Sequence, residues 1–538
     1  MKYSVQTNRI FGKDWLQYHP YDDVTSIDNY YIGLCNHVLK IILQSEIAKF
    51  IDNSKEEKKI ACVLVSYFED VISETQLFSA FTRLHNRMYG KKLPFYEISD
   101  DYYDDEVNIH DIYFLIWYQI SVQNKDIIID PCFENSEAFL DAVTEIDNLF
   151  NNEFEKAPQN DRLQKYLQIS ADSDVKSVRE KISFIACKSY LWKSVFDNYI
   201  KKVLDKYKEK SKGKDIIVLD EHTEMKIYDQ RIHFYFNEYL PLLSMRVNDY
   251  YAEILGNENP EYQFIKNISK RIFGSFLIRK IDRDGFLIEH LTSKKQLRLS
   301  NEFTSLQGIK LIENETVLSL GLVKWKNDVW QNQGGCMVNT LTELKGEDII
   351  SRHLFDDENQ KLESIQQLEK AFLELTDGKR MVYFRGKRAY SEFHLKLARK
   401  HAKIVKPDIT EQELDKTYKN LIAQIERNLP FEDDETFGIF FNSIGGIEIY
   451  MEGVISCMKD KNNPYYDAHD EFDMCDLIII DTFSKEFINY ILENDLINLN
   501  CGDYENPDMF KIIMENLDFL LRFYRRSQYF SEPRVSIV

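Results

Sequence analysis

Two spacings of apolar residues divide this chain, and the change between them at about residue 274 limits the folds it can adopt. Before that point apolar side chains recur every three or four positions, which is the period of a helix with one buried face. From Leu64 to Leu84 this spacing predicts one helix, which Gly90 ends. Residues 112–118 are apolar all round, which indicates a helix inside a bundle. Another long helix is expected over Glu224 to Leu255.

After residue 274 the apolar segments become short and turn residues separate them. Residues 275–281 and 286–291 flank an Asp-Arg-Asp-Gly turn, and similar segments follow, which predicts about five strands in a small barrel of the SH3-like or OB kind. Helical spacing returns at 362–375, and Gly445-Gly446 marks a later hairpin. We expect a mainly α, multidomain protein. Its domains are a helical region (1–262), the β-barrel (263–342), a helical segment with a basic helix (343–430) and an α+β region (431–538).

The charge balance and the cysteines indicate where such a chain works. A formal net charge of -21 favours solubility and discourages non-specific adhesion to nucleic acid or to an anionic membrane. The first residues, Met1 to Asp14, lack the apolar core of a signal peptide, and the run 112–118 is far shorter than the ~20 residues that span a bilayer. None of the eight cysteines forms a Cys-x-x-Cys pair, so we expect reduced thiols. The prediction is a cytoplasmic protein with no membrane contact.

Several strings of this sequence resemble an uncharacterised bacterial family, one of the domains of unknown function. The similarity covers most of the chain, and it implies no activity, substrate or catalytic residue. The strings that carry it include KDWLQYHPY (13–21), YFEDVISE (67–74), AFTRLHNRMYGKKLPFY (80–96), DIYFLIWYQI (111–120), GLVKWKNDVW (321–330) and FLLRFYRRSQYF (519–530).

The segment from Lys379 to Lys406 concentrates positive charge. It holds ten Lys or Arg residues against the single acid Glu392, so it carries about +9 in an acidic chain. A helix that starts near Ser391 would turn several of these cations outward, where they could replace the counterions of phosphates. The alternative is that they pair with acidic surface of the same chain. The candidates for phosphate or nucleic-acid binding are Lys387, Arg388, Lys396, Arg399, Lys400 and Lys403, with Arg279 and Arg298 of the barrel as possible support.

Two acidic clusters have the residue types of a metal site but not its spacing. One runs from Asp467 to Asp476 with His469 inside it, and the other from Asp100 to Asp111 with His110 inside it. Carboxylates with an imidazole can bind a hard metal, but neither cluster has the spacing and turn glycine of an EF-hand loop. We therefore expect two solvated loops, no metal and no cofactor.

No catalytic motif is written in the chain: a Gly-x-Ser-x-Gly elbow, a phosphate-binding loop and a His-Glu-x-x-His pair are all missing. Catalytic residues are therefore unknown at this point. The expectation is a non-catalytic intracellular binding protein that engages a protein partner. Two alternatives stay open. One is a nucleic-acid-binding protein that uses residues 379–406 and the barrel, and the other is an enzyme whose site assembles only in space.

Overall fold

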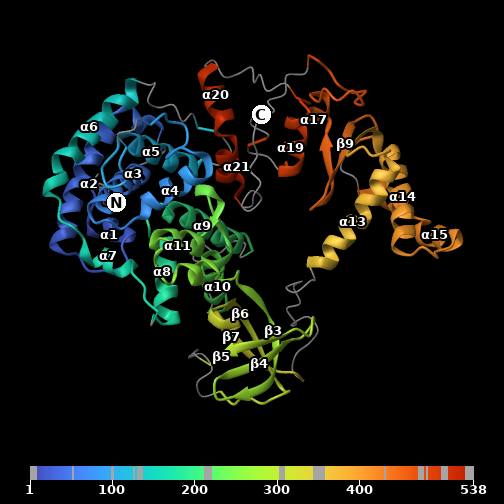
Figure 1. Cartoon of the computed structure of the whole chain (residues 1–538), viewed down its shortest axis with the longest axis horizontal. Coiled ribbons are helices and arrows are strands. Elements are labelled where there is room, and N and C mark those ends of the chain that lie inside the picture. The colour runs from blue at the N-terminus through green and yellow to red at the C-terminus, as the bar shows by residue number, and fades with distance from the viewer. Residues whose placement is uncertain are drawn as a thin grey trace, which may run out of the picture. The chain divides into compact units, whose positions relative to one another are not determined.

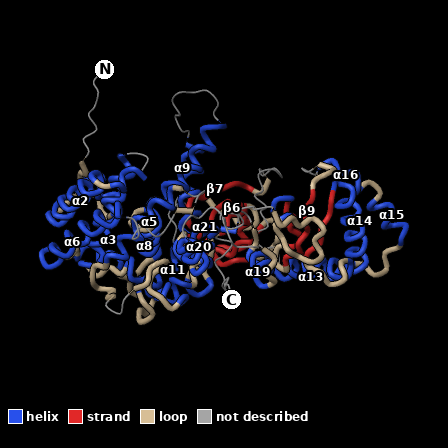
Figure 2. Tube along the Cα trace, turned by 90° about the horizontal axis from the view of Figure 1, so that it is seen from above, coloured by secondary structure: helices blue, strands red, loops and turns tan. Residues whose placement is uncertain are grey.

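The computed structural model describes residues 9–50, 54–98, 102–124, 128–129, 137–171, 173–210, 221–301, 309–342, 358–428, 432–469, 478–479, 483–497 and 507–526. The chain forms two compact units. The first is Met1–Leu354 with Arg522–Phe530, and the second is Phe355–Leu521 with Ser531–Val538. The expected mainly helical class is confirmed, with strands in a few sheets only (Figure 2). The division into four domains stays a prediction.

Helices make up most of the first unit (Figure 1). The helix predicted to lie inside a bundle is confirmed, because all residues of α5 from Asp111 to Val122 are buried. Trp117 at its centre is 0% exposed. The helices are α1 (Gly12–Trp15), α2 (Ser26–Gln44), α3 (Ser54–Ile72), α4 (Leu77–Tyr89), α5 (Ile109–Gln123), α6 (Glu137–Glu153), α7 (Asp161–Leu167), α8 (Val175–Cys187), α9 (Lys193–Lys210), α10 (Glu221–Asn237), α11 (Val247–Leu255) and α12 (Tyr262–Lys266).

A buried polar network fastens the start of the chain to α3. His19 Nε2 lies 2.8 Å from Glu69 Oε2, and each side chain is 1% exposed. Burial lowers the pKa of His19, but attraction to Glu69 and the hydrogen bond between them outweigh it, so the pKa is raised. Asn160 Nδ2 donates to Glu69 Oε1 at 2.8 Å and to the Tyr21 hydroxyl at 2.6 Å. Three segments distant in sequence are thereby tied together.

The long helix expected over Glu224 to Leu255 is wrong. The structure ends α10 at Asn237 and places a two-stranded ladder, β1 (Tyr239–Leu240) and β2 (Met245–Arg246), before α11. Pro241 starts the turn between these strands, and its missing N–H and fixed φ are incompatible with a helix interior. Leu243 then adopts a positive φ of 60°. Apolar residues keep helical spacing on both sides of this break, so the spacing alone predicted one continuous helix.

The predicted set of five strands after residue 274 is confirmed, and the strands close into a ring in the order β3-β4-β5-β7-β6. All pairings are antiparallel except β5 with β7, which is parallel. Gly285 has a φ of 150° in the tight turn after β3, and a Cβ there would overlap the backbone of Leu299. The strands are β3 (Ile272–Asp282), β4 (Gly285–His290), β5 (Gln296–Ser300), β6 (Thr316–Lys324) and β7 (Trp330–Thr340).

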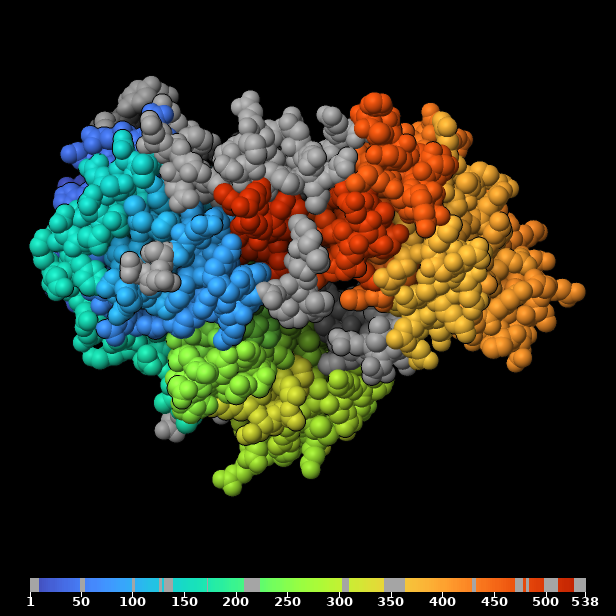
Figure 3. Space-filling view, turned by 45° about the horizontal axis from the view of Figure 1, so that its top comes forward, coloured from blue at the N-terminus to red at the C-terminus, as the bar shows by residue number. Residues whose placement is uncertain are grey.

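Arg271 joins this ring of strands to α10. Its side chain is 2% exposed, pairs with Asp229 of α10, and donates from Nε to the Gln333 carbonyl at 2.7 Å. The last residue of α10, Asn237, exchanges two hydrogen bonds of 2.9 Å with the Arg271 backbone. Gly321 leaves the space that the guanidinium occupies, since a Cβ on it would overlap that group. In the space-filling view the barrel, light green to yellow, lies directly against the helical residues that precede it (Figure 3).

The second unit is built on a three-stranded antiparallel sheet in the order β10-β9-β8. The hairpin predicted around Gly445-Gly446 is confirmed as β9 and β10. Phe437, Ile439 and Phe441 of β9 pack under α13 and α14, beside Phe372 and Phe393. The elements are α13 (Glu358–Leu375), β8 (Met381–Arg385), α14 (Gly386–Val405), α15 (Glu411–Tyr418), α16 (Leu421–Asn428), β9 (Thr436–Asn442), β10 (Gly446–Met451), α17 (Glu452–Ser456), α19 (Lys485–Glu493), α20 (Pro507–Glu515) and α21 (Leu517–Arg525), whose residues from Arg522 on belong to the first unit.

Gly321→Ala tests the joint between α10 and the barrel. The added methyl group displaces the Arg271 guanidinium from Asp229 and Gln333, so we expect unfolding to become easier by about 1–3 kcal/mol. Gly33→Ala is the matched control, because a Cβ at that exposed helical position meets nothing within 4 Å. It should stabilise the chain by roughly 0.5–1 kcal/mol. Thermal and urea unfolding measure both, and equal effects of the two substitutions would contradict the assignment.

Candidate functional site

The helix predicted from Leu64 to Gly90 is interrupted, and the interruption creates the candidate site. The structure has two helices here, α3 and α4, separated by Ser73 to Gln76. Glu74 and Gln76 adopt positive φ values of 51° and 65°. The segment contains no Gly or Pro, which are the usual signals for such a break. Apolar residues keep helical spacing on both sides, so the prediction of one continuous helix is wrong.

Asp70 holds the break in place. Its Oδ1 accepts hydrogen bonds from the Leu77 N–H at 3.0 Å and from the Thr75 hydroxyl at 2.5 Å. Its Oδ2 accepts from the Phe78 N–H at 2.8 Å and from the Tyr190 hydroxyl at 2.7 Å. The first N–H groups of a helix have no partner within it, so Asp70 acts as the cap that α4 would otherwise lack.

Burial of the Asp70 carboxyl disfavours its charged form. It is 4% exposed, and burial raises its pKa even though four hydrogen bonds act in the opposite direction. A buried carboxyl is tolerated because each of its acceptor positions is used. Replacing it would leave two N–H groups of α4 without their cap.

A second buried carboxyl, Asp111, faces the same opening from the first turn of α5. The Tyr67 hydroxyl donates to its Oδ2 at 2.6 Å, and the Tyr102 hydroxyl donates to its Oδ1 at 2.9 Å. Burial raises the pKa of Asp111 to about 7, against the lowering effect of these hydrogen bonds. A carboxyl of this kind can exchange a proton near neutral pH.

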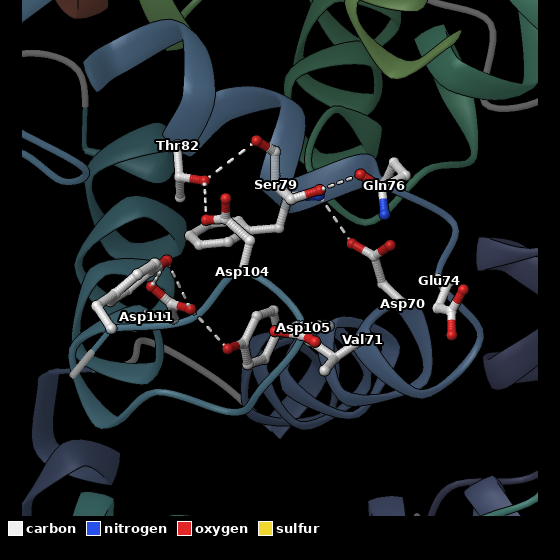
Figure 4. Close-up of a pocket in the computed structure, with 12 residues that line it drawn as sticks. Asp70, Val71, Glu74, Gln76, Ser79, Thr82, Asp104, Asp105 and Asp111 are labelled. Atoms are coloured by element: carbon white, nitrogen blue, oxygen red, sulfur yellow. Dashed lines mark hydrogen bonds between the residues drawn. The ribbon is translucent and has the colours of Figure 1, made fainter. Parts of the chain in front are cut away.

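These groups line an open pocket between α3, α4 and the loop before α5 (Figure 4). The pocket encloses about 360 Å³ of empty space, counted with the solvent at its mouth. Asp104 points into it and accepts a hydrogen bond from the Thr82 hydroxyl at 3.1 Å. The twelve lining residues are Tyr67, Asp70, Val71, Glu74, Gln76, Phe78, Ser79, Thr82, Tyr102, Asp104, Asp105 and Asp111.

The lining is acidic and rich in oxygen. It includes five carboxyl groups and no Lys, Arg or His. Two cations lie beside it, where Lys92 pairs with Asp104 at 2.8 Å and Arg83 donates to Gln76 Oε1 at 2.7 Å. In the part of the chain that the structure describes, no three His, Cys, Asp or Glu side chains are arranged to hold a metal ion.

The structure places most of the predicted phosphate-binding residues in ion pairs within the second unit. Arg399 binds Glu411 and Asp415, each at 2.6 Å, and Lys400 binds Glu374 at 3.1 Å. The pairs of the other candidates are Lys387 with Glu432 at 3.7 Å, Arg388 with Glu392 at 2.7 Å, and Lys403 with Glu411 at 2.5 Å. Lys396 is exposed on α14. The helix begins at Gly386, five residues before the expected start.

The barrel arginines are paired in the same way. Arg279 binds Glu289 at 2.8 Å, and Arg298 of β5 binds Asp282 at the end of β3. Both arginines are partly exposed. A phosphate would therefore meet guanidinium groups that already have carboxylate partners.

The predicted acidic loops have different outcomes. Residues 102–108 are outside regular structure, as expected, but the prediction of a solvated loop is wrong for Asp111, which is 2% exposed and belongs to α5 with His110. The continuous apolar run at residues 112–118, which directly follows Asp111, was the signal for an earlier helix start. In the second cluster, Asp467 and His469 lie in a loop, and residues 470–476 lie outside the described residues.

The fold and the pocket define a mainly helical protein with a closed five-stranded sheet and a small acidic pocket. Comparison with protein families gives one match, over residues 9–283, to a family described as "Protein of unknown function (DUF3843)". The match spans just over half of the chain, which therefore belongs to this family and confirms the resemblance to a family of unknown function. No curated protein and no solved structure matches the chain. Among the described residues no helix is both long and apolar enough to cross a membrane.

Asp111 gives the stability of the chain a specific pH dependence. Its pKa is raised from 3.8 to about 7 in the folded state, so between these values the folded chain binds more protons than the unfolded chain. Stability must then fall as pH rises through this window. Between pH 5 and pH 7 this effect lowers the free energy of unfolding by about 2–3 kcal/mol, and Asp111→Asn should remove that decrease.

Urea unfolding at a series of pH values measures this effect. Asp105→Asn, at an exposed position of the same pocket, is the matched control and should leave the decline in place. If the Asp111→Asn chain followed the pH profile of the parent, Asp111 would not titrate as described.

Proposed function

We propose that this chain is a binding protein whose first unit receives a basic side chain of a protein partner in the acidic pocket. The observation that carries the proposal is the composition of the lining, with five carboxyl groups and no Lys, Arg or His. An ammonium or guanidinium group would gain charge-assisted hydrogen bonds from such a surface. An anion would be repelled by it.

The aromatic rings of the pocket support the same class of ligand. Tyr67, Phe78 and Tyr102 present rings beside the carboxyl groups. The face of an aromatic ring carries partial negative charge and attracts cations. One cation of the chain already uses this property, since Lys92 Nζ lies 5.6 Å from the centre of the Tyr102 ring.

The size of the opening favours a single side chain over a large ligand. Its empty space of about 360 Å³ includes open solvent at the mouth, so the enclosed part is small. Long aliphatic stems of Lys and Arg can lie along Val71 and Phe78 while their charged ends reach the carboxyl groups. The net charge of -21 would further speed the approach of a basic partner.

A peptide with one lysine flanked by neutral residues tests the proposal. We expect it to bind, and acetylation of the lysine to abolish binding, because acetylation removes the charge. Glu74→Gln combined with Asp105→Asn should weaken binding about tenfold, since exposed charge contacts contribute up to about 1 kcal/mol each. Isothermal titration calorimetry at low salt gives the dissociation constants.

The matched control is Asp433→Asn combined with Asp434→Asn, which makes the same change of net charge at exposed positions of the second unit. It should leave the affinity unchanged.

A bound cation stabilises the charged form of Asp111, so the affinity for the peptide should also rise as pH increases through about 7, and Asp111→Asn should remove that rise. Equal binding of acetylated and unmodified peptides would contradict the proposal.

Phosphate or nucleic-acid binding by α14 is the second candidate. Its support is the exposure of Arg388, Lys396 and Lys403 along one helix. Phosphates would have to displace the carboxylates that pair with two of these cations, although exposed ion pairs are individually weak. A titration of mixed DNA and RNA at low salt decides this candidate. Binding that weakens with salt and with Lys396→Ala would support it, and absence of binding would exclude it.

A further inference from the structure

Among the described residues, no strand pairs with one edge of the three-stranded sheet of the second unit. In the described part of the chain, β10 pairs with β9 alone. That pairing runs without a bulge from Gly446 opposite Asn442 to Met451 opposite Phe437. An edge strand presents a row of N–H and C=O groups that can pair with another strand. Proteins usually protect such edges with Lys, Pro or a bulge, and β10 has none of these.

Apolar side chains continue to this edge, and two of them are partly exposed there. Ile447, Ile449 and Met451 share the face of the sheet that α13 and α14 cover over β9. Ile449 is nevertheless 38% exposed and Met451 is 41% exposed. Ile444, in the hairpin turn next to them, is 77% exposed.

The only charged side chain of β10 is used within the chain. Glu448 Oε1 accepts from Asn442 Nδ2 at 2.7 Å, and Oε2 accepts from the Tyr450 hydroxyl at 2.7 Å and the Ser484 hydroxyl at 2.8 Å. The carboxylate is therefore held on the opposite face and does not guard the edge.

The other edge of the same sheet differs. Two cations, Lys379 and Arg380, precede β8, and the exposed Arg385 ends it. Arg380 is bridged to Glu369 and Glu486. The Tyr383 hydroxyl of this strand donates to Asp460 at 2.8 Å. One edge thus carries the charges that discourage strand pairing, and the other lacks them.

We propose that β10 pairs antiparallel with β10 of a second copy of this chain, across a two-fold axis at Ile449. This inference concerns the second unit and is independent of the acidic pocket. Directly opposite residues of an antiparallel pair project on the same face. The axis places Ile449 opposite Ile449 of the second copy and Ile447 opposite Met451 of the second copy. Ile447, Ile449 and Met451 each gain an apolar neighbour.

The opposite face is compatible with the same register. Glu448 comes to lie opposite Tyr450 of the second copy. This places a hydrogen-bond acceptor beside a hydroxyl group, and the same two residue types already form a hydrogen bond within one chain. No two like charges face each other. A two-fold interface needs such self-complementarity, because the same patch meets itself. A second copy satisfies this condition with no further assumption about sequence.

Sedimentation velocity of the full chain tests the proposal. A six-residue strand pair is a small interface, so we expect a monomer–dimer equilibrium between about 1 and 100 µM. Ile449→Lys places two positive charges against each other at the axis and should raise the dissociation constant at least about tenfold. Val405→Lys is the control, because Val405 is 55% exposed at the end of α14 and is not part of β10. This substitution should leave the equilibrium unchanged.

Hydrogen exchange locates the interface if dimers form. Amides of residues 446–451 should exchange more slowly above the dissociation constant than below it, while those of residues 381–385 on the guarded edge should not change. Circular dichroism confirms that the variants are folded. A monomer at every concentration, a dimer unaffected by Ile449→Lys, or protection confined to other segments would each overturn the proposal.

Discussion

The candidate site depends on one buried carboxyl group, that of Asp70. Its oxygens bind two N–H groups at the start of α4 and two hydroxyl groups, one of them from Tyr190 on a distant segment. Without this cap the apolar spacing of the sequence favours a continuous helix over the break. The break turns α4 away from the axis of α3 and leaves the space that Glu74, Asp104 and Asp111 line. The pocket is therefore a direct consequence of how one helix start is satisfied.

Burial determines the chemistry of this pocket as much as composition does. Asp70 and Asp111 are both nearly inaccessible and both have raised pKa values, because removal from water disfavours the charged form. A cation that enters the pocket would offset part of that penalty. The cations of α14, in contrast, are largely matched by carboxylates of neighbouring helices. The full sequence also has an acidic balance, with a formal net charge of -21.

The sequence was informative wherever apolar spacing and local geometry agree. The buried helix around Trp117, the Asp-Arg-Asp-Gly turn and the hairpin at Gly445-Gly446 are all present. In each case short-range residue chemistry suffices. The break at Ser73 to Gln76 was missed because its cap is a side chain several residues upstream, assisted by Tyr190. Asp111 was assigned to a loop because only tertiary packing shows that Tyr67 and Tyr102 enclose it.

The central claim is that the acidic pocket receives a basic side chain. A crystal structure of the chain grown with N-acetyl-arginine amide tests it most directly, since that molecule carries one guanidinium group and no other charge. The account predicts that the guanidinium lies within hydrogen-bonding distance of Glu74, Asp104 or Asp105. An empty pocket in crystals saturated with the ligand, or a guanidinium bound only at another acidic surface, would contradict it.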